Sequence, residues 1–354
     1  MDARNLSSYR IAHVVGARPQ FVKLKPLVEA IQRLGGVNWV AHTGQHYDSQ
    51  MNASFWDELG VAPDYHGTWI ERNADVRALV AALREAQVHA VVVYGDTDST
   101  VLGAQAALEL GIPFAHAEAG LRSFNDAMPE ERNRVWVDRR ALWLWAPTEV
   151  AMDHIRRENL DRGAPWVVKT GDLMLDAFPK HPWSQLQSST VLVTIHRNTN
   201  VDDPERIRRI EAALDGLVGD FDVLWPRHPR HRAAGLHSVR VPDCAPLSRP
   251  EIVDALYRAE FIITDSGGLQ KEAFFAGRRA IVLRDETEWT ELVDSGWTSL
   301  ISPDSTELEA AIRAQLGRWA QIGHSEPPKL YGDGCAADAM AVSLAQGLRE
   351  LSQS

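Results

Sequence analysis

Arg18, Asp96 and Glu118 each stand shortly after a stretch that the sequence pattern predicts to be a buried strand. The three apolar runs are residues 10–15, 90–94 and 112–117. Because the carboxyl ends of parallel strands meet at one edge of a sheet, where ligands bind, we expect these side chains to surround one site. A lone aspartate in such a place is more often a helix cap. Three strands that deliver Arg, Asp and Glu to the same edge favour a site.

A further carboxylate, Glu130, begins a predicted helix. Pro129 suits the first turn of a helix, and acidic residues there suit the helix dipole. Carboxylates can act as general acids and bases, and they stabilise oxocarbenium character at a sugar carbon. Asp96, Glu118 and Glu130 are therefore the candidate acid/base groups. Spacing alone does not separate Glu130 from its neighbour Glu131.

Two predicted strand-to-helix turns are suited to anions. In the first, Gly16 permits a tight turn and Arg18 opens the helix, with Lys23 a turn further on. The pattern of this turn taken alone favours solvated surface charges for these two cations, and the other motifs shift the interpretation towards an anion site. In the second, the Ser266-Gly267-Gly268 turn offers a hydroxyl, close backbone approach and a helix N-terminus to a phosphate. Glu272, within the first turns of that helix, can accept hydrogen bonds from ribose hydroxyls.

The chain contains two successive series of alternating strands and helices. A segment rich in Pro, Gln and Ser, residues 179–189, interrupts the alternation, and we place a domain boundary there. The pattern predicts an α/β protein of two doubly wound, Rossmann-like domains, residues 1–178 and 190–330. The cleft between two such domains is the default ligand site.

The composition of the chain argues against several classes of function. The 354 residues carry a formal net charge of -11, which argues against nucleic acid or an anionic membrane as a partner. No apolar run is long enough to span a bilayer, and the first nine residues lack the apolar core of a signal segment. The two cysteines, Cys244 and Cys335, are far apart and show no metal spacing. We therefore expect a cytoplasmic protein that is not inserted into a membrane.

With these motifs in view, the chain resembles the UDP-N-acetylglucosamine 2-epimerase family, of the type related to GT-B glycosyltransferases. The resemblance spans nearly the whole chain. The segments that carry it are 16–20 (GARPQ), 43–46 (TGQH), 95–97 (GDT), 116–122 (HAEAGLR), 129–134 (PEERNR), 146–149 (APTE), 170–172 (TGD), 196–197 (HR), 264–272 (TDSGGLQKE), 284–288 (RDETE) and 331–334 (YGDG).

The resemblance implies a GT-B-like fold, in which the C-terminal helix, residues 335–354, completes the first domain. It implies a homodimer, a UDP-sugar substrate and no metal or NAD cofactor. The implied reaction is an isomerase reaction, epimerisation at C2 of UDP-N-acetylglucosamine or a related UDP-2-acetamido sugar to the manno epimer. It would proceed by anti elimination of UDP, a 2-acetamidoglucal intermediate and syn readdition.

Site residues are assigned on the same basis, with the catalytic carboxylates in the first domain and the UDP site in the second. His116 and His13 lie inside strand-like runs and are interpreted as packing residues. The catalytic residues implied are Asp96, Glu118, Glu130 and His196. The residues implied to bind substrate or UDP are Arg18, Lys23, Arg134, Ser266, Gly267, Gly268 and Glu272.

The chain departs from the family pattern at three places. Residues 69–76 do not show the Gln/Arg-rich segment of bacterial members that use substrate as an activator, so that regulation is not implied. Gln20 stands where the family has Glu, and Asn198 follows His196-Arg197 where a Glu is usual. Residues 43–47 and 270–275 look closer to relatives that act on more decorated UDP-sugars. The alternatives are a hydrolysing 2-epimerase that releases N-acetylmannosamine and UDP, a GT-B glycosyltransferase, and a non-catalytic sugar-nucleotide sensor.

Overall fold

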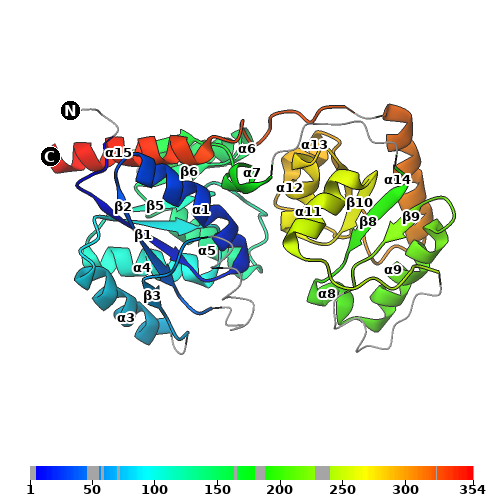
Figure 1. Ribbon diagram of the computed structural model, residues 1–354, viewed down its shortest axis with the longest axis horizontal. Helices are drawn as coiled ribbons and strands as arrows, with labels where there is room; N and C mark the ends of the chain where they lie inside the picture. Colours follow the sequence, from blue (N-terminus) through cyan, green and yellow to red (C-terminus); the bar gives the residue numbers. More distant parts are fainter. Residues whose placement is uncertain are drawn as a thin grey trace. The chain divides into compact units, whose positions relative to one another are not determined.

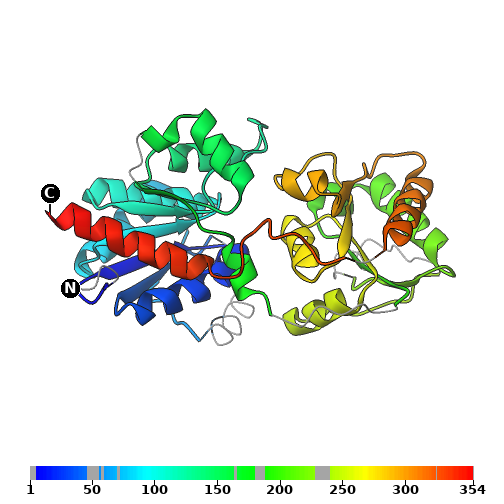
Figure 2. The same ribbon diagram turned by 90° about the horizontal axis from the view of Figure 1, so that it is seen from above.

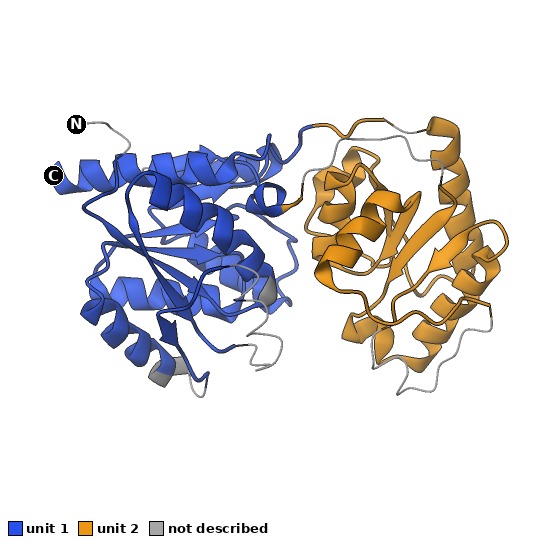
Figure 3. Cartoon of the chain, in the orientation of Figure 1, with its two compact units in different colours: residues 1–177, 329–354 blue, residues 178–328 orange. Residues whose placement is uncertain are grey.

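The computed structural model describes residues 5–45, 56, 60–69, 72–162, 166–179, 188–227, 240–323 and 325–353, without the side chains of residues 18 and 72–74. The chain divides into two compact units (Figure 3). Unit 1 comprises residues 1–177 and 329–354, and unit 2 comprises residues 178–328. Each is described by itself below.

Unit 1 is built on a seven-stranded sheet whose pairings are all parallel (Figure 1). Its strands are β1 (Arg10–Val15), β2 (Val37–His42), β3 (Tyr65–His66), β4 (Ala90–Tyr94), β5 (Phe114–Ala117), β6 (Trp143–Ala146) and β7 (Trp166–Lys169). Their order is β3-β2-β1-β4-β5-β6-β7, so successive strands are added to one side of β1 up to β3 and to its other side from β4 onwards. The position between β1 and β4 is called the reversal point below. In open parallel sheets ligands bind outside the strand ends at such a reversal. Asp96 lies in the loop after β4, and Arg18 begins the helix that follows β1.

Helices cover both faces of this sheet, which explains why β4 is buried along its whole length and is purely apolar. The helices of unit 1 are α1 (Arg18–Arg33), α3 (Arg72–Glu85), α4 (Asp98–Leu110), α5 (Pro129–Asp138), α6 (Glu149–Arg157), α7 (Leu173–Ala177) and α15 (Ala336–Gln353), with the 3₁₀ turn η1 (Leu160–Arg162). α1 turns Phe21, Leu24, Leu27 and Ile31 into the core at the spacing that the sequence shows.

The C-terminal helix α15 packs against α1 and the sheet of unit 1 (Figure 2). Two tryptophans of β6 hold it: Trp143 donates from Nε1 to the Ser343 backbone oxygen at 3.1 Å, and Trp145 donates to Ser343 Oγ at 3.3 Å. Asp176 of α7 accepts from the first two backbone amides of the helix. The buried face of α15 is thus part of the core of unit 1.

Gly347 allows α15 to approach Trp143 closely. A Cβ at this position would lie 2.5 Å from the indole ring, which is fully buried and stacked on Trp166. We expect Gly347→Ala to destabilise unit 1 by about 1–3 kcal/mol, because overpacking outweighs the better helix propensity of Ala. The matched control is Gly317→Ala in α14, where a Cβ would meet no atom within 4 Å. Urea unfolding should show a lower midpoint for the first variant only, and equal midpoints would contradict this packing.

Unit 2 has a five-stranded parallel sheet of order β12-β11-β10-β8-β9. Its strands are β8 (Thr190–Thr194), β9 (Asp222–Leu224), β10 (Phe261–Thr264), β11 (Arg279–Val282) and β12 (Thr298–Leu300). Its helices are α8 (Asn198–Val201), α9 (Pro204–Leu217), α11 (Arg249–Arg258), α12 (Gly267–Phe275), α13 (Thr290–Asp294) and α14 (Leu308–Ile322). The strand order reverses between β8 and β10, and these two strands lead into His196 and the Ser266-Gly267-Gly268 turn.

Both units confirm the predicted fold class, an α/β chain with two doubly wound parallel sheets. Among the described residues, an apolar cluster underlies α1 and α15 in unit 1, and two clusters flank the sheet of unit 2. Among the described helices, none is both long and apolar enough to cross a membrane.

Candidate active site

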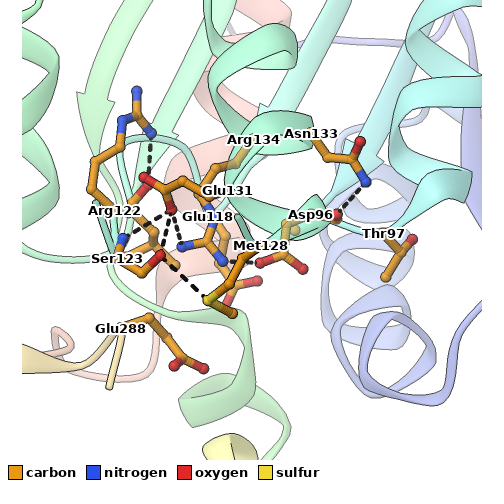
Figure 4. Close-up of polar contacts among 12 residues, drawn as sticks. Asp96, Thr97, Glu118, Arg122, Ser123, Met128, Glu131, Asn133, Arg134 and Glu288 are labelled. Atoms are coloured by element: carbon orange, nitrogen blue, oxygen red, sulfur yellow. Dashed lines mark hydrogen bonds and ion pairs between the residues drawn. The ribbon is translucent and has the colours of Figure 1, made fainter. Parts of the chain in front are cut away.

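Asp96 lies on the turn between β4 and α4, at the reversal point of the first sheet. Its carboxylate forms an ion pair with Arg134 of α5 (Figure 4). Thr97, and not Asp96, is the N-cap of α4. Desolvation raises the pKa of Asp96, although the side chain keeps 30% exposure; Arg134 opposes this rise and Glu118 adds to it. A carboxyl with a raised pKa can exchange a proton nearer to neutral pH.

Glu118 directly follows β5, has a strained backbone conformation and faces the same turn. Its φ of 73° lies in the left-handed region, which costs energy for a residue with a side chain and is commonest at functional sites. The carboxylate pairs with Lys23 of α1, and both side chains are less than 10% exposed. A Cβ at Gly95 would lie 3.2 Å from Glu118 Oε2, so the carboxylate reaches over the residue that precedes Asp96. The structure thus brings Asp96, Glu118, Lys23 and Arg134 together.

The glutamate that joins this cluster from α5 is Glu131, and not the predicted Glu130. Glu131 Oε2 accepts from Arg134 Nη1 at 3.1 Å and from both the backbone N and Oγ of Ser123 at 2.9 Å (Figure 4). Glu131 is 2% exposed, whereas Glu130 is exposed. Glu131 therefore ties the loop after β5 to α5, and the role of Glu130 in sugar chemistry stays a prediction.

The cations predicted to bind UDP from unit 1 have different environments. Lys23 and Arg134 are engaged with the carboxylates just described, so each lowers the pKa of Asp96. Arg18 is the first residue of α1, at the end of the β1 turn. Its side chain lies outside the described part of the chain.

A buried polar network holds the loops that follow β4 and β5. His116 Nδ1 lies 2.6 Å from Asp138 Oδ1, and His116 Nε2 lies 2.7 Å from the backbone oxygen of Gly95. Arg122 donates to Asp138 Oδ2 at 2.7 Å and to Glu158 at 2.6 and 3.0 Å. His116 is buried, as expected for a packing residue, but the structure corrects that interpretation because both ring nitrogens have polar partners. His13 resembles it: its ring contacts Tyr94 and Asn38, and burial lowers its pKa to about 4.

In unit 2, His196 is positioned through its backbone. The fully buried carboxylate of Asp265 accepts from the backbone amides of His196 at 3.1 Å and Arg197 at 3.0 Å, and from Asn200 Nδ2 at 3.0 Å. The imidazole itself is half exposed, with Nδ1 3.8 Å from Asp265. Asp265 therefore joins the loop after β8 to the turn after β10.

The Ser266-Gly267-Gly268 turn has the predicted form. Ser266 caps α12 by accepting from the Leu269 backbone amide at 3.3 Å, which leaves its hydroxyl proton available to a ligand. A Cβ at Gly267 would lie 2.7 Å from Glu288 Oε1, so the absence of a side chain here lets the Glu288 carboxylate approach the turn. Glu272 is buried, and its Oε2 accepts from Arg249 Nη1 at 2.6 Å.

Sequence reasoning missed three residues that hold these groups, Asp138, Arg249 and Asp265, and it left Glu131 unseparated from Glu130. Asp265 and Glu131 adjoin assigned residues, and their position beside a turn or helix start is the signal that could have found them. Asp138 and Arg249 meet their partners only through the fold. Within the described part of the chain, no three His, Cys, Asp or Glu side chains gather as a metal site would require.

The chain matches a known protein family and curated relatives over most of its length. The family model described as UDP-N-acetylglucosamine 2-epimerase matches residues 31–345. The chain is 38% identical to a UDP-2,3-diacetamido-2,3-dideoxy-D-glucuronate 2-epimerase of Pseudomonas aeruginosa, over 95% of this chain and 99% of the relative.

Two solved structures are similar over nearly their whole length. The first is S. aureus MnaA in its structure with UDP, at 27% identity and a TM-score of 0.83, covering 96% of this chain and 97% of that one. The second is the Methanocaldococcus jannaschii UDP-GlcNAc 2-epimerase with UDP-GlcNAc and UDP, at 28% identity and a TM-score of 0.79, covering 98% and 100%. These matches confirm the GT-B-like fold class. The chain therefore belongs to the UDP-N-acetylglucosamine 2-epimerase family.

Proposed function

We propose that this epimerase inverts C2 of a UDP-2-acetamido sugar, UDP-N-acetylglucosamine or a relative of it. The observation that carries the proposal is that the carboxylates of Asp96 and Glu118 lie close together at the reversal point of the first sheet, in a chain of this family. Two carboxylates of unequal environment provide both a base and an acid. Their partners Lys23 and Arg134 place positive charge beside them.

The chemistry follows from the substrate. The C2 proton is not next to a carbonyl, so the C1–O bond to UDP must break as the proton leaves. The electron pair of the C2–H bond then forms the C1=C2 bond of a 2-acetamidoglucal, and UDP takes the electrons of the broken bond. Readdition of UDP to C1 with a proton delivered to the other face of C2 gives the manno epimer. Asp96 and Glu118, with Glu130, would exchange these protons, and carboxylates also stabilise positive charge at C1.

We assign the nucleotide to unit 2 and the sugar chemistry to unit 1. Ser266 and the two glycines after it would donate to the diphosphate, and His196 would add a cation or hydrogen bond there. Arg18 would contribute from the start of α1. Glu272 would accept from the ribose hydroxyls, oriented by Arg249.

A prediction tests the nucleotide assignment. Glu272→Ala should weaken UDP binding by about 1–3 kcal/mol, because ribose hydroxyls and Arg249 lose a buried acceptor. Isothermal calorimetry with UDP measures this directly. Glu326→Ala, which removes an exposed carboxylate in the same unit, is the matched control and should leave the affinity unchanged. Equal affinities in both variants would remove Glu272 from the UDP site.

A second substrate has specific support. The relative at 38% identity is named for UDP-2,3-diacetamido-2,3-dideoxy-D-glucuronate. We therefore propose this more decorated sugar nucleotide as the alternative substrate. Comparison of kcat/KM for the two UDP-sugars decides between them.

The reaction itself is tested in deuterated water with each UDP-sugar. Deuterium at C2 of the nucleotide sugar supports the proposed epimerisation. Deuterium at C2 of a free sugar, with UDP released, identifies the hydrolysing type instead. No exchange with either substrate would contradict both and point to glycosyl transfer or sensing.

We also propose that the enzyme acts as a homodimer in the cytoplasm, where UDP-sugars are made and used. The family resemblance supports the dimer. Light scattering coupled to size exclusion tests it, and a mass of 39.4 kDa would identify a monomer.

A further inference from the structure

Arg284 is a nearly buried cation beside the Ser266-Gly267-Gly268 turn, called the Ser266 turn below. It stands just after β11, which pairs in parallel with β10, the strand that leads into the turn. The backbone amide of Leu283 donates to the Thr264 backbone oxygen at 2.8 Å, so the two chain segments are still joined where they leave the sheet. Arg284 is 8% exposed. Two neighbouring strands of unit 2 thus end in a glycine turn and in an arginine.

The loop from Arg284 to Trp289 is fastened to α12, the helix that the Ser266 turn begins. Thr287 Oγ1 donates to Gln270 Oε1 at 3.1 Å. Lys271 Nζ lies 3.7 Å from the centroid of the Trp289 ring, and both of these side chains are buried. The fold of unit 2 therefore sets the position of Arg284 relative to the turn, and little ordering of this side chain remains for a ligand to bring about.

The guanidinium of Arg284 reaches the turn itself. A Cβ at Gly267 would lie 3.8 Å from Arg284 Nη1, and the same Nη1 donates to Glu288 Oε2 at 3.2 Å. Among the described residues, Glu288 is the one side chain that accepts a hydrogen bond from this guanidinium, and it engages one of its three nitrogen atoms. Arginine has five N–H donors in a planar fork that matches the oxygens of a phosphate. Most donors of a nearly buried cation thus remain for an anionic ligand.

The Ser266 turn adds uncharged donors to this cation. α12 has nine residues, and among the described residues no acceptor binds the backbone amides of Gly267 and Gly268, the first two of the helix. Such amides and the helix dipole favour an anion. Ser266 Oγ accepts from the helix and keeps its proton for a ligand. A guanidinium, a hydroxyl and two amides at one place are the donors that a diphosphate requires.

We propose that Arg284 binds the diphosphate of the UDP-sugar at the Ser266 turn and neutralises the charge that UDP gains when it leaves C1. The proposal rests on the proposed function and deepens it. As the C1–O bond breaks, UDP keeps the electron pair of that bond, so its diphosphate gains one negative charge. A fixed guanidinium in a nearly buried site stabilises such a charge more than a solvated cation does. Arg284 therefore contributes to the binding of UDP and still more to the transition state.

The test compares UDP with uridine, which lacks both phosphates. Isothermal calorimetry gives the dissociation constant of UDP, and ligand-observed NMR gives that of the weaker uridine. Both are measured for wild type, Arg284→Gln, Arg284→Lys and Glu288→Gln. Arg258→Gln is the matched control, because Arg258 is an arginine of the same unit whose side chain is 71% exposed. Thermal unfolding shows whether each variant is folded.

Arg284→Gln should weaken UDP binding by about tenfold or more and change uridine binding by less than about twofold, because charged hydrogen bonds to phosphate alone are lost. Arg284→Lys keeps the charge but not the fork, so its UDP affinity should lie between the two. Glu288→Gln keeps an acceptor for Nη1 and removes a negative charge beside the turn, so it should bind UDP at least as tightly as wild type. With the UDP-sugar, Arg284→Gln should also lower kcat by about tenfold or more. Arg258→Gln should follow wild type throughout.

Equal UDP affinities in wild type and Arg284→Gln overturn the proposal. A loss in Arg284→Gln that is as large for uridine as for UDP overturns it too, as does an equal loss in Glu288→Gln, because each identifies a structural role for the ion pair. Should Arg284→Gln not fold, the comparison of UDP with uridine in Arg284→Lys decides. A wild type that binds UDP but exchanges no deuterium contradicts the proposed epimerisation alone, since the titrations need no turnover. A wild type that binds no UDP contradicts both proposals.

Discussion

Replacing Asp96 with asparagine is expected to lower epimerisation by about 10²–10⁴-fold, the range that a positioned acid/base group contributes. Asparagine keeps the shape and one oxygen for Arg134 but cannot accept the proton from carbon or deliver one to it. UDP affinity should remain near that of wild type, because we assign the nucleotide contacts to unit 2. Turnover and the rate of deuterium incorporation at C2 measure the first effect, and calorimetry with UDP measures the second.

The pH dependence of the wild type gives an independent check on Asp96. Burial raises the pKa of this carboxyl, and the neighbouring Glu118 adds to the rise. If Asp96 acts as the base, its ionised form is required, so kcat should fall as pH decreases through this raised pKa. Asp126→Asn, an exposed aspartate in the loop before α5, serves as the control and should change neither rate nor profile. A wild-type rate in Asp96→Asn would refute the assignment.

The other carboxylates are separated by the same assay. Glu118→Gln and Glu130→Gln should each abolish epimerisation if the family assignment holds for this chain. Glu131→Gln should instead perturb the loop at Ser123, because Glu131 accepts two hydrogen bonds from that residue. Loss of exchange with an unchanged folded state in Glu131→Gln, together with full activity in Glu130→Gln, would move the role by one residue.

The sequence predicted the supporting framework of this site better than its internal contacts. Apolar runs that end in polar residues located Asp96, Glu118 and the Ser266 turn, since such runs become parallel strands and their ends share an edge. The sequence could not show which of two neighbouring helix residues is the buried one. Glu130 and Glu131 have the same side chain and differ by about 100° around α5, so only the packing of α5 decides which one is buried.

Pairs that are distant in sequence were also beyond prediction. Asp138 meets His116 across 22 residues, and Arg249 meets Glu272 across 23. No periodicity links such positions, because the contact exists only after helix and strand have docked. The same holds for Gln20: its place in the first turn of α1 was readable, but its bonds to Tyr94 and Thr97 depend on the adjacency of β1 and β4.

Replacing Asp138 with alanine is expected to have a large effect on the stability of unit 1. The Asp138 carboxylate contacts His116 at 2.6 Å, Arg122 at 2.7 Å and the Gly120 amide at 3.1 Å. The side chains of Asp138, His116 and Arg122 are each 0–1% exposed. Asp138→Ala would leave a buried guanidinium with part of its charge unpaired. Removal of one partner from a buried ion pair costs about 3–5 kcal/mol, and we expect the unfolding free energy of unit 1 to fall by that amount.

Acid should remove this difference between Asp138→Ala and wild type. Burial alone would raise the pKa of Asp138, but His116 and Arg122 lower it by more, so the folded pKa lies below the ordinary value. The stabilisation is therefore present above the unfolded pKa of about 3.9 and is lost as pH falls through the folded pKa. Denaturant unfolding followed by tryptophan fluorescence should show a large gap near neutral pH that narrows below about pH 4. Asp153→Ala, which removes an exposed partner of Arg156, is the control. If Asp138→Ala were as stable as that variant, the network would contribute little to the fold, and the support it gives to the Gly95 carbonyl beside Asp96 would have to come from His116 alone.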